Sequence, residues 1–173
     1  INQARAQHIT VRGYISCVLG CPYEGEVATS AVDRLADDLL QAGRYEVSLG
    51  DTIGVGTARK AQNLVRELST TIPIQQLAVH FHDTYGQALA NILACLELGV
   101  RTVDASVAGL GGCPYARGAT GNVATEDVLY LLSGLGLETG VDLPAVAATG
   151  QWISGQLGRE NNSRAGRALL KSC

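Results

Sequence analysis

The alternation of strand-like and helix-like segments constrains the fold of this chain more than any other feature. Four segments are rich in β-branched residues and bounded by glycine or polar turn residues, namely 9–18, 45–49, 77–81 and 100–107. Helical patterns separate them. A strand that alternates with a helix in this way indicates repeated βαβ units, and therefore an α/β fold with a parallel sheet.

Apolar residues between the strand-like segments recur at the spacing of an amphipathic helix. The stripes are Val27, Ala31, Leu35, Leu39 and Leu40, with Gly43 at the expected C-terminal cap; Ala61, Leu64, Val65 and Leu68; and Leu89, Ile92, Leu93 and Leu96, ending near Gly99. Two more helices are predicted at 126–132, with Thr125 as the N-cap, and at 144–157.

The length of one strand plus its following helix suits a (β/α)8 TIM barrel. A complete barrel typically needs about 250 residues, whereas this sequence has 173. Four parallel strands alone would also leave two open edges and an uncovered sheet face. We therefore expect residues 1–157 to be the C-terminal half of a barrel, four βα units plus C-terminal helices, with the other half outside this sequence. Residues 158–173 are predicted to be a polar, frayed or surface tail. The alternative is an independent four-stranded α/β domain.

Composition excludes several classes of protein. Apolar residues make up 46% of the chain, charged residues 17%, and the net charge is -3, which is typical of a folded domain and not of a disordered one. No basic stretch or membrane-length apolar run is present, so we expect neither a nucleic-acid nor a membrane partner. The five scattered cysteines favour a reducing compartment over a disulfide framework.

The sharpest local motif is His80-Phe81-His82. Residues two apart in a strand point to the same side, so both imidazoles should face one space at the end of a strand. Two convergent imidazoles suggest a metal site, although a pair of buried, satisfied histidines remains the alternative. With oxygen donors such as Asn122, the site suits Mg2+ or Mn2+ better than zinc; Asn122 could instead cap the following helix.

The loop 108–122 holds five glycines in fifteen residues, which permits sharp bends and close approach to a ligand. It matches neither a phosphate loop nor a dinucleotide fingerprint. Cys113 in this loop could act as an acid or a nucleophile, or could be an incidental small residue. Asp51, which follows the second strand, could accept a proton or cap the next helix. The Tyr14 ring, inside the first strand, could belong to the core.

Four stretches together resemble the 3-hydroxy-3-methylglutaryl-CoA lyase family: SVAGLGGCPYA (106–116), VRGYISCVLGCPYEG (11–25), SLGDTIGVGT (48–57) and VHFHDTYGQALAN (79–91). The resemblance runs from about Val11 to Gly140. The wider superfamily, with isopropylmalate and homocitrate synthases, shares the histidine pair but lacks the GGCPYA loop. A Claisen-type synthase and a non-enzymatic metal-binding module are therefore the alternatives.

The resemblance implies cleavage of 3-hydroxy-3-methylglutaryl-CoA to acetoacetate and acetyl-CoA with a divalent cation, as in leucine degradation and ketogenesis. It assigns roles to seven residues: His80, His82 and Asn122 as metal ligands, Cys113 as the catalytic loop cysteine, Asp51 as an acidic residue required near the metal, and Thr52 and Tyr14 as substrate contacts.

Some functional residues of the family have no counterpart among these 173 residues. The family's first strand supplies an adjacent Arg-Asp pair, of which the aspartate is a metal ligand, and its second strand supplies a glutamate. We therefore expect the isolated chain to be inactive. The resemblance also implies a CoA thioester as the small-molecule partner, a homodimer, and a location that is cytoplasmic if the source is bacterial or the mitochondrial matrix if it is eukaryotic.

Overall fold

The computed structural model describes residues 1–112 and 121–171, and the chain divides into two compact units. The first is built of residues 1–104. The second contains residues 105–112 and, among those described, 121–171.

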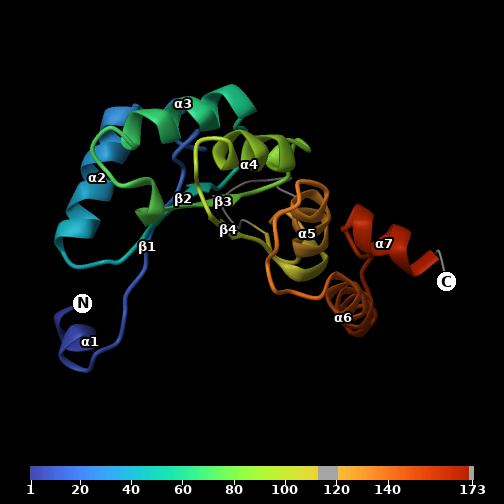
Figure 1. Cartoon of the computed structure of the whole chain (residues 1–173). Helices are drawn as coiled ribbons and strands as arrows, with labels where there is room; N and C mark the ends of the chain where they lie inside the picture. The colour runs from blue at the N-terminus through green and yellow to red at the C-terminus, as the bar shows by residue number, and fades with distance from the viewer. Residues whose placement is uncertain (113–120, 172–173) are drawn as a thin grey trace. The chain divides into compact units, whose positions relative to one another are not determined.

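The first unit is a parallel sheet with helical connections. Its elements are α1 (Asn2–Ala6), β1 (Gly13–Ile15), α2 (Thr29–Gln41), β2 (Val47–Asp51), α3 (Ala58–Leu68), the 3-10 turn η1 (Ile74–Gln76), β3 (Leu77–Phe81), α4 (Ala88–Leu96) and β4 (Thr102–Asp104). The strands described pair in parallel in the order β1-β2-β3-β4 (Figure 1). Sequential order without a reversal is the arrangement of a barrel and differs from a doubly wound sheet. The predicted βαβ repeat is confirmed.

Helices α2, α3 and α4 lie along one face of this sheet (Figure 1). The side chains of Leu49, Val79 and Phe81 point to that face and are buried. Gly13 of β1 lies directly under α2, since a Cβ at this position would be 3.0 Å from the Leu39 side chain. Alternation along each strand leaves the opposite face for the residues in between.

The structure confirms one predicted helical stripe and corrects another. The stripe of α3 is confirmed, with Ala61, Leu64, Val65 and Leu68 all buried. In α2 the buried residues are Val32 and Ala36, whereas Leu35 is 52% exposed. Apolar residues occur in adjacent pairs along this helix, so two stripes are available. The small Ala36 side chain permits the closer approach to the sheet, which the spacing alone does not show.

Both outer strands are shorter than predicted. β1 covers Gly13–Ile15 and β4 covers Thr102–Asp104, against 9–18 and 100–107 from the sequence. Cys17 adopts a left-handed backbone with a φ of 62°, which ends the extended segment soon after β1. The sequence segments rich in β-branched residues are longer than the segments that pair with a neighbouring strand. Because a strand is defined by its pairing, composition alone overestimates its length.

The second unit consists of η2 (Val107–Gly109), α5 (Thr125–Gly134), α6 (Leu143–Gln156) and α7 (Arg164–Lys171). The start of α6 follows its sequence signals, because the Asp142 carboxylate accepts from the Ala145 N–H and a proline occupies the first turn. The predicted cap of α5 is wrong by one residue. Ala124 is the N-cap and Thr125 is the first helical residue.

The expected frayed tail is also corrected, because residues 164–171 form α7. The buried Asp127 of α5 accepts from the Ser163 hydroxyl at 2.7 Å and from the Ala165 N–H at 2.7 Å. Ser163 itself is fully buried. The carboxylate that satisfies the first turn of α7 therefore comes from a distant helix, which a local reading of a polar tail does not detect.

We predict that Asp127→Ala lowers the free energy of unfolding by about 2–3 kcal/mol, because it leaves the Ser163 hydroxyl and two amide groups of α7 without a charged acceptor. Urea denaturation followed by circular dichroism measures the change. The matched control is Asp142→Ala, which removes an exposed cap with one bond to Ala145 and should cost about 1 kcal/mol or less. Equal losses in the two variants would contradict this account of α7.

Candidate active site

The two histidines of the predicted motif lie side by side at the carboxyl end of β3. Their ring centroids are 5.6 Å apart and the ring planes are tilted by 55°. The prediction that both imidazoles face the same side is therefore confirmed. The carboxyl ends of parallel strands are the place where barrel enzymes carry their catalytic residues.

Polar residues that the sequence analysis did not single out, Arg12, Ser48 and Asp104 among them, share this face of the sheet with Tyr14 and His80. The register aligns Tyr14 with Ser48 and His80 with Asp104. In each strand or directly beside it, two polar residues lie two positions apart, namely Arg12/Tyr14, Glu46/Ser48, His80/His82 and Thr102/Asp104. This repeated spacing is the signal that could have identified them, because period two places both members on one face.

Asp104 is the centre of an ion-pair network. Its Oδ1 accepts from Arg12 at 2.6 Å, its Oδ2 accepts from the Ser48 hydroxyl at 2.7 Å, and His80 Nδ1 lies 3.6 Å from Oδ2. Burial by itself would raise the pKa of Asp104, but the interactions with His80, Arg12 and Ser48 outweigh it and lower the pKa to about 2. The carboxylate is therefore ionised throughout the physiological range.

Arg12 connects this network to the first two strands. Its Nε lies 2.6 Å from a Glu46 carboxylate oxygen, and its guanidinium carbon lies 5.0 Å from the centre of the Tyr14 ring. The Arg12 side chain is only 18% exposed. A guanidinium with two carboxylate partners, one just before β2 and one on β4, is held in one orientation.

His82 is nearly buried, with 6% of its surface exposed. Burial, the neighbouring His80 and a hydrogen bond to the Thr52 backbone act on its pKa; the first two lower it, and they outweigh the third. The ring is therefore neutral near pH 7 and keeps a lone pair, which a metal ligand requires. Thr52 also accepts from the Cys17 N–H through Oγ1 at 2.9 Å, which ties together the loops after β1 and β2.

Asp51 does not lie with the imidazoles. It pairs in register with Phe81, so its side chain points to the helix-covered face, opposite His80. Its fully buried carboxylate accepts from the Gly56 N–H at 2.8 Å and the Val55 N–H at 3.2 Å. Burial raises the pKa of Asp51, and these amide groups partly oppose the shift. The predicted helix-capping alternative is wrong for Asp51, because Thr57 is the N-cap of α3 and Asp51 instead accepts from the amide groups of the loop 51–56 that presents Thr52.

Tyr14 is on the imidazole face, not in the core. Its side chain is 56% exposed, and its ring meets the His80 ring edge-on with the centroids 6.1 Å apart. The Arg12 guanidinium donates to the Tyr14 hydroxyl at 2.7 Å. The interpretation of this ring as core is wrong, because its strand position faces away from the helices.

Two predicted site residues remain, Asn122 and Cys113. Asn122 belongs to the second unit, where its amide group donates to the Leu110 carbonyl at 2.9 Å. Nearby, the buried Glu126 carboxylate accepts from the N–H of Ala108, whose φ of 55° is left-handed. Burial raises the pKa of Glu126. Cys113 lies outside the described residues.

Within residues 1–112 and 121–171, no group of three or more His, Cys, Asp or Glu side chains could hold a metal. Of the predicted ligands, His80 and His82 lie on one face of the sheet in the first unit, and Asn122 belongs to the second unit. Neutral imidazole nitrogens and an amide oxygen are donors that a divalent cation can accept.

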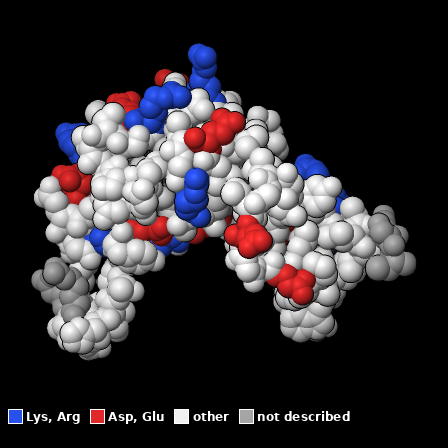
Figure 2. Space-filling model, viewed as in Figure 1, with Lys and Arg blue, Asp and Glu red and all other residues white. Residues whose placement is uncertain are grey.

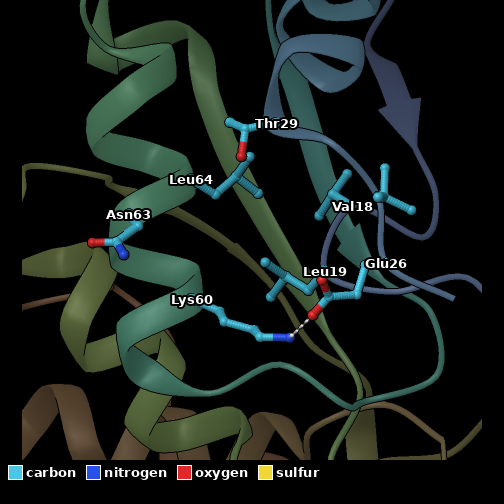
Figure 3. A pocket seen from close by; sticks show the side chains of 8 residues that line it. Val18, Leu19, Glu26, Thr29, Lys60, Asn63 and Leu64 are labelled. Atoms are coloured by element: carbon cyan, nitrogen blue, oxygen red, sulfur yellow. Dashed lines mark hydrogen bonds and ion pairs between the residues drawn. The ribbon is translucent and has the colours of Figure 1, made fainter.

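A separate cavity of about 220 Å³ lies between the loop after β1 and α3 (Figure 3). Lys60 reaches across it to Glu26 at 3.3 Å, but both side chains are well exposed and the pair contributes little. None of its lining residues is a predicted site residue. On the face drawn in Figure 2, acidic and basic side chains are interspersed.

Comparison with known proteins identifies the family. Residues 2–153 match the HMGL-like family. This chain belongs to the HMGL-like family. A relative from Pseudomonas aeruginosa named 3-hydroxy-3-isohexenylglutaryl-CoA/hydroxy-methylglutaryl-CoA lyase is 59% identical over 98% of this chain and 57% of its own length. The cytoplasmic 3-hydroxy-3-methylglutaryl-CoA lyase of Danio rerio is 57% identical over 97% of this chain and 50% of its own length.

Solved structures agree with this assignment. The hydroxymethylglutaryl-CoA lyase from Pseudomonas aeruginosa superposes with a TM-score of 0.96 at 59% identity, over 99% of this chain and 57% of that one. An HMG-CoA lyase from Acinetobacter baumannii, in complex with coenzyme A and 3-methylmalate, superposes with a TM-score of 0.90 at 34% identity, over 96% of this chain and 54% of that one. The chain thus spans about half the length of its relatives.

The family and the solved structures together identify the fold of this HMGL-like chain. Its parallel βα units belong to a TIM-barrel fold, which confirms the predicted class over an independent four-stranded domain. Relatives are named as cytoplasmic in Danio rerio and as mitochondrial in Gallus gallus. Among the helices of the described residues, none is both long and apolar enough to cross a bilayer.

We predict that the His82 imidazole titrates below the ordinary histidine pKa of about 6.5, because burial and His80 disfavour its charged form. The unfolded chain then binds this proton more readily than the folded chain. The contribution of His82 to stability therefore falls as the pH drops below about 6.5. A pH titration of the imidazole by 15N NMR measures the value, with the urea-unfolded chain as control. A folded-state pKa equal to or above the unfolded one would refute the prediction.

Proposed function

We propose that this protein acts as a hydroxymethylglutaryl-CoA lyase, a carbon–carbon lyase that cleaves 3-hydroxy-3-methylglutaryl-CoA to acetoacetate and acetyl-CoA. The observation that carries the proposal is the imidazole pair on the polar sheet face, in a chain 59% identical to a relative named as such a lyase. Because the chain spans about half of that relative, the proposal concerns the whole protein.

The proposed cofactor is a divalent cation, Mg2+ or Mn2+, held by His80, His82 and Asn122. The neutral His82 ring supports this, as does the alignment of both rings on one face. Such an ion polarises substrate oxygens and makes a bound hydroxyl more acidic. Further ligands, and the arginine that the resemblance implies, are proposed to come from residues outside these 173.

The chain's own residues are proposed to position the substrate and handle protons. The tertiary hydroxyl of the substrate loses its proton to a base. The electron pair left on that oxygen forms the ketone of acetoacetate as the carbon–carbon bond breaks. The electron pair of the broken bond remains on the acetyl-CoA enolate. Cys113 then gives a proton to that carbon. Tyr14 and Thr52 are proposed to contact the substrate, and Asp51 is proposed to act near the metal by fixing the loop 51–56.

The proposed substrate class is a CoA thioester with a branched 3-hydroxyglutaryl group. The Acinetobacter baumannii relative with coenzyme A and 3-methylmalate supports it, and so does the name of the Pseudomonas aeruginosa relative, which includes a longer-chain analogue. A homodimer remains a prediction from the resemblance. Cytoplasmic and mitochondrial locations both remain predictions, each tied to the source.

The decisive experiment assays the full-length gene product with 3-hydroxy-3-methylglutaryl-CoA and Mg2+ or Mn2+ and follows acetoacetate release. We expect turnover by the full-length protein and none by the 173-residue chain. The control offers acetyl-CoA with a 2-oxo acid. Condensation in that assay, without cleavage in the first, would replace the lyase with a synthase. Turnover by the 173-residue chain would refute its expected inactivity.

We predict that Cys113→Ala in the full-length protein lowers turnover by roughly 100-fold or more while leaving Mn2+ affinity unchanged, because the thiol moves a proton and does not bind the ion. His82→Ala should weaken Mn2+ binding directly. Steady-state kinetics and Mn2+ titration by electron paramagnetic resonance separate the effects. The matched control is Cys21→Ala, in the similar Gly-Cys-Pro-Tyr segment after β1. Loss of turnover in the Cys21 variant alone would transfer the role to Cys21.

A further inference from the structure

We propose that Asp104 is a positioning residue that holds the His80 imidazole in its Nδ1–H tautomer, so that the Nε2 lone pair is the one available for a metal ion. The inference deepens the proposed function and rests on it for the metal, although the tautomer itself can be measured without any metal. The observation behind it is the contact between His80 Nδ1 and Asp104 Oδ2 at 3.6 Å.

The Asp104 carboxylate is fixed before it meets His80. Arg12 donates to Oδ1 at 2.6 Å, and Ser48 donates to Oδ2 at 2.7 Å. Arg12 is in turn held by Glu46 at 2.6 Å. These partners come from β2 and from the segments that precede β1 and β2, and a sheet is more rigid than a loop. The carboxylate therefore presents Oδ2 to the imidazole in one orientation.

Among the described residues, the imidazole nitrogen that faces Asp104 has no hydrogen-bond partner closer than this carboxylate. Nδ1 of His80 is buried and makes no short hydrogen bond in the structure. Its close charged neighbour is an acceptor, so a hydrogen on Nδ1 is favoured and a lone pair there is disfavoured. In a neutral ring, a hydrogen on Nδ1 leaves Nε2 as the acceptor. Carboxylate–histidine pairs orient metal ligands by this means.

The two histidines are thus positioned differently. The backbone of Thr52, which no side-chain substitution removes, acts on the His82 ring, whereas His80 faces the side chain of Asp104. A change at Asp104 should therefore alter His80 while leaving His82 in place.

The test is the 15N NMR spectrum of the metal-free 173-residue chain, labelled at histidine nitrogen and recorded at a pH where the rings are neutral. We expect the wild-type His80 spectrum to show the Nδ1–H tautomer. In Asp104→Asn, Arg12 keeps the amide oxygen, so the NH2 group turns toward His80 and should convert it to the Nε2–H tautomer. An Nε2–H tautomer in the wild type overturns the proposal, whether or not the variant folds.

The matched control is Glu46→Gln, which alters the other carboxylate on Arg12 but leaves the contact between Asp104 and His80. It should keep the wild-type tautomer. If the two variants change the His80 spectrum alike, the network has a general structural role and the proposal fails.

A second measurement separates this inference from the proposed function. In the full-length protein, Mn2+ affinity should fall about 10-fold to 100-fold in Asp104→Asn, and much less in Glu46→Gln. Unchanged affinity in Asp104→Asn would overturn the link between tautomer and metal. If the wild type binds no Mn2+ but shows the Nδ1–H tautomer, the metal part of the proposed function fails while the positioning role of Asp104 stands.

Discussion

The parallel register of β1 to β4 is the constraint on which the site depends. It aligns Tyr14 with Ser48 and His80 with Asp104, so polar residues that are distant in sequence become neighbours on one face. Helices cover the other face with apolar contacts. A slip of one residue in any strand would turn its polar pair into the helix layer. Burial of the apolar face therefore also sets the position of the imidazoles.

The ion pairs of Arg12, Glu46 and Asp104 serve orientation more than stability. Charges that are this little exposed lose much of their hydration, and their mutual attraction typically repays only part of that loss. Their value lies in geometry, since a guanidinium between two carboxylates holds both. The low pKa of Asp104, about 2, reflects the same partners and keeps a fixed negative charge beside His80.

Sequence patterns predicted β3 at its observed bounds, the buried stripe of α3 and the convergence of His80 and His82, because each depends on local spacing. They failed where a distant partner decides the outcome. α7 is a helix whose first turn is satisfied by Asp127 from α5, and Asp104 is engaged by an arginine 92 positions earlier. For Asp51, spacing left catalysis and capping equally open, and only the fold shows its carboxylate among the amides of its own loop.

The sequence by itself determined the alternation of strands and helices, the family and the side-chain types at the ends of the strands, because periodicity and motif spacing are written along the chain. The tertiary structure alone decided which of these side chains meet. The contact of Asp104 with Arg12 and His80 exists only after the strands β1 to β4 have paired in register. Pairing is a cooperative property of the whole sheet and cannot be read from any one segment.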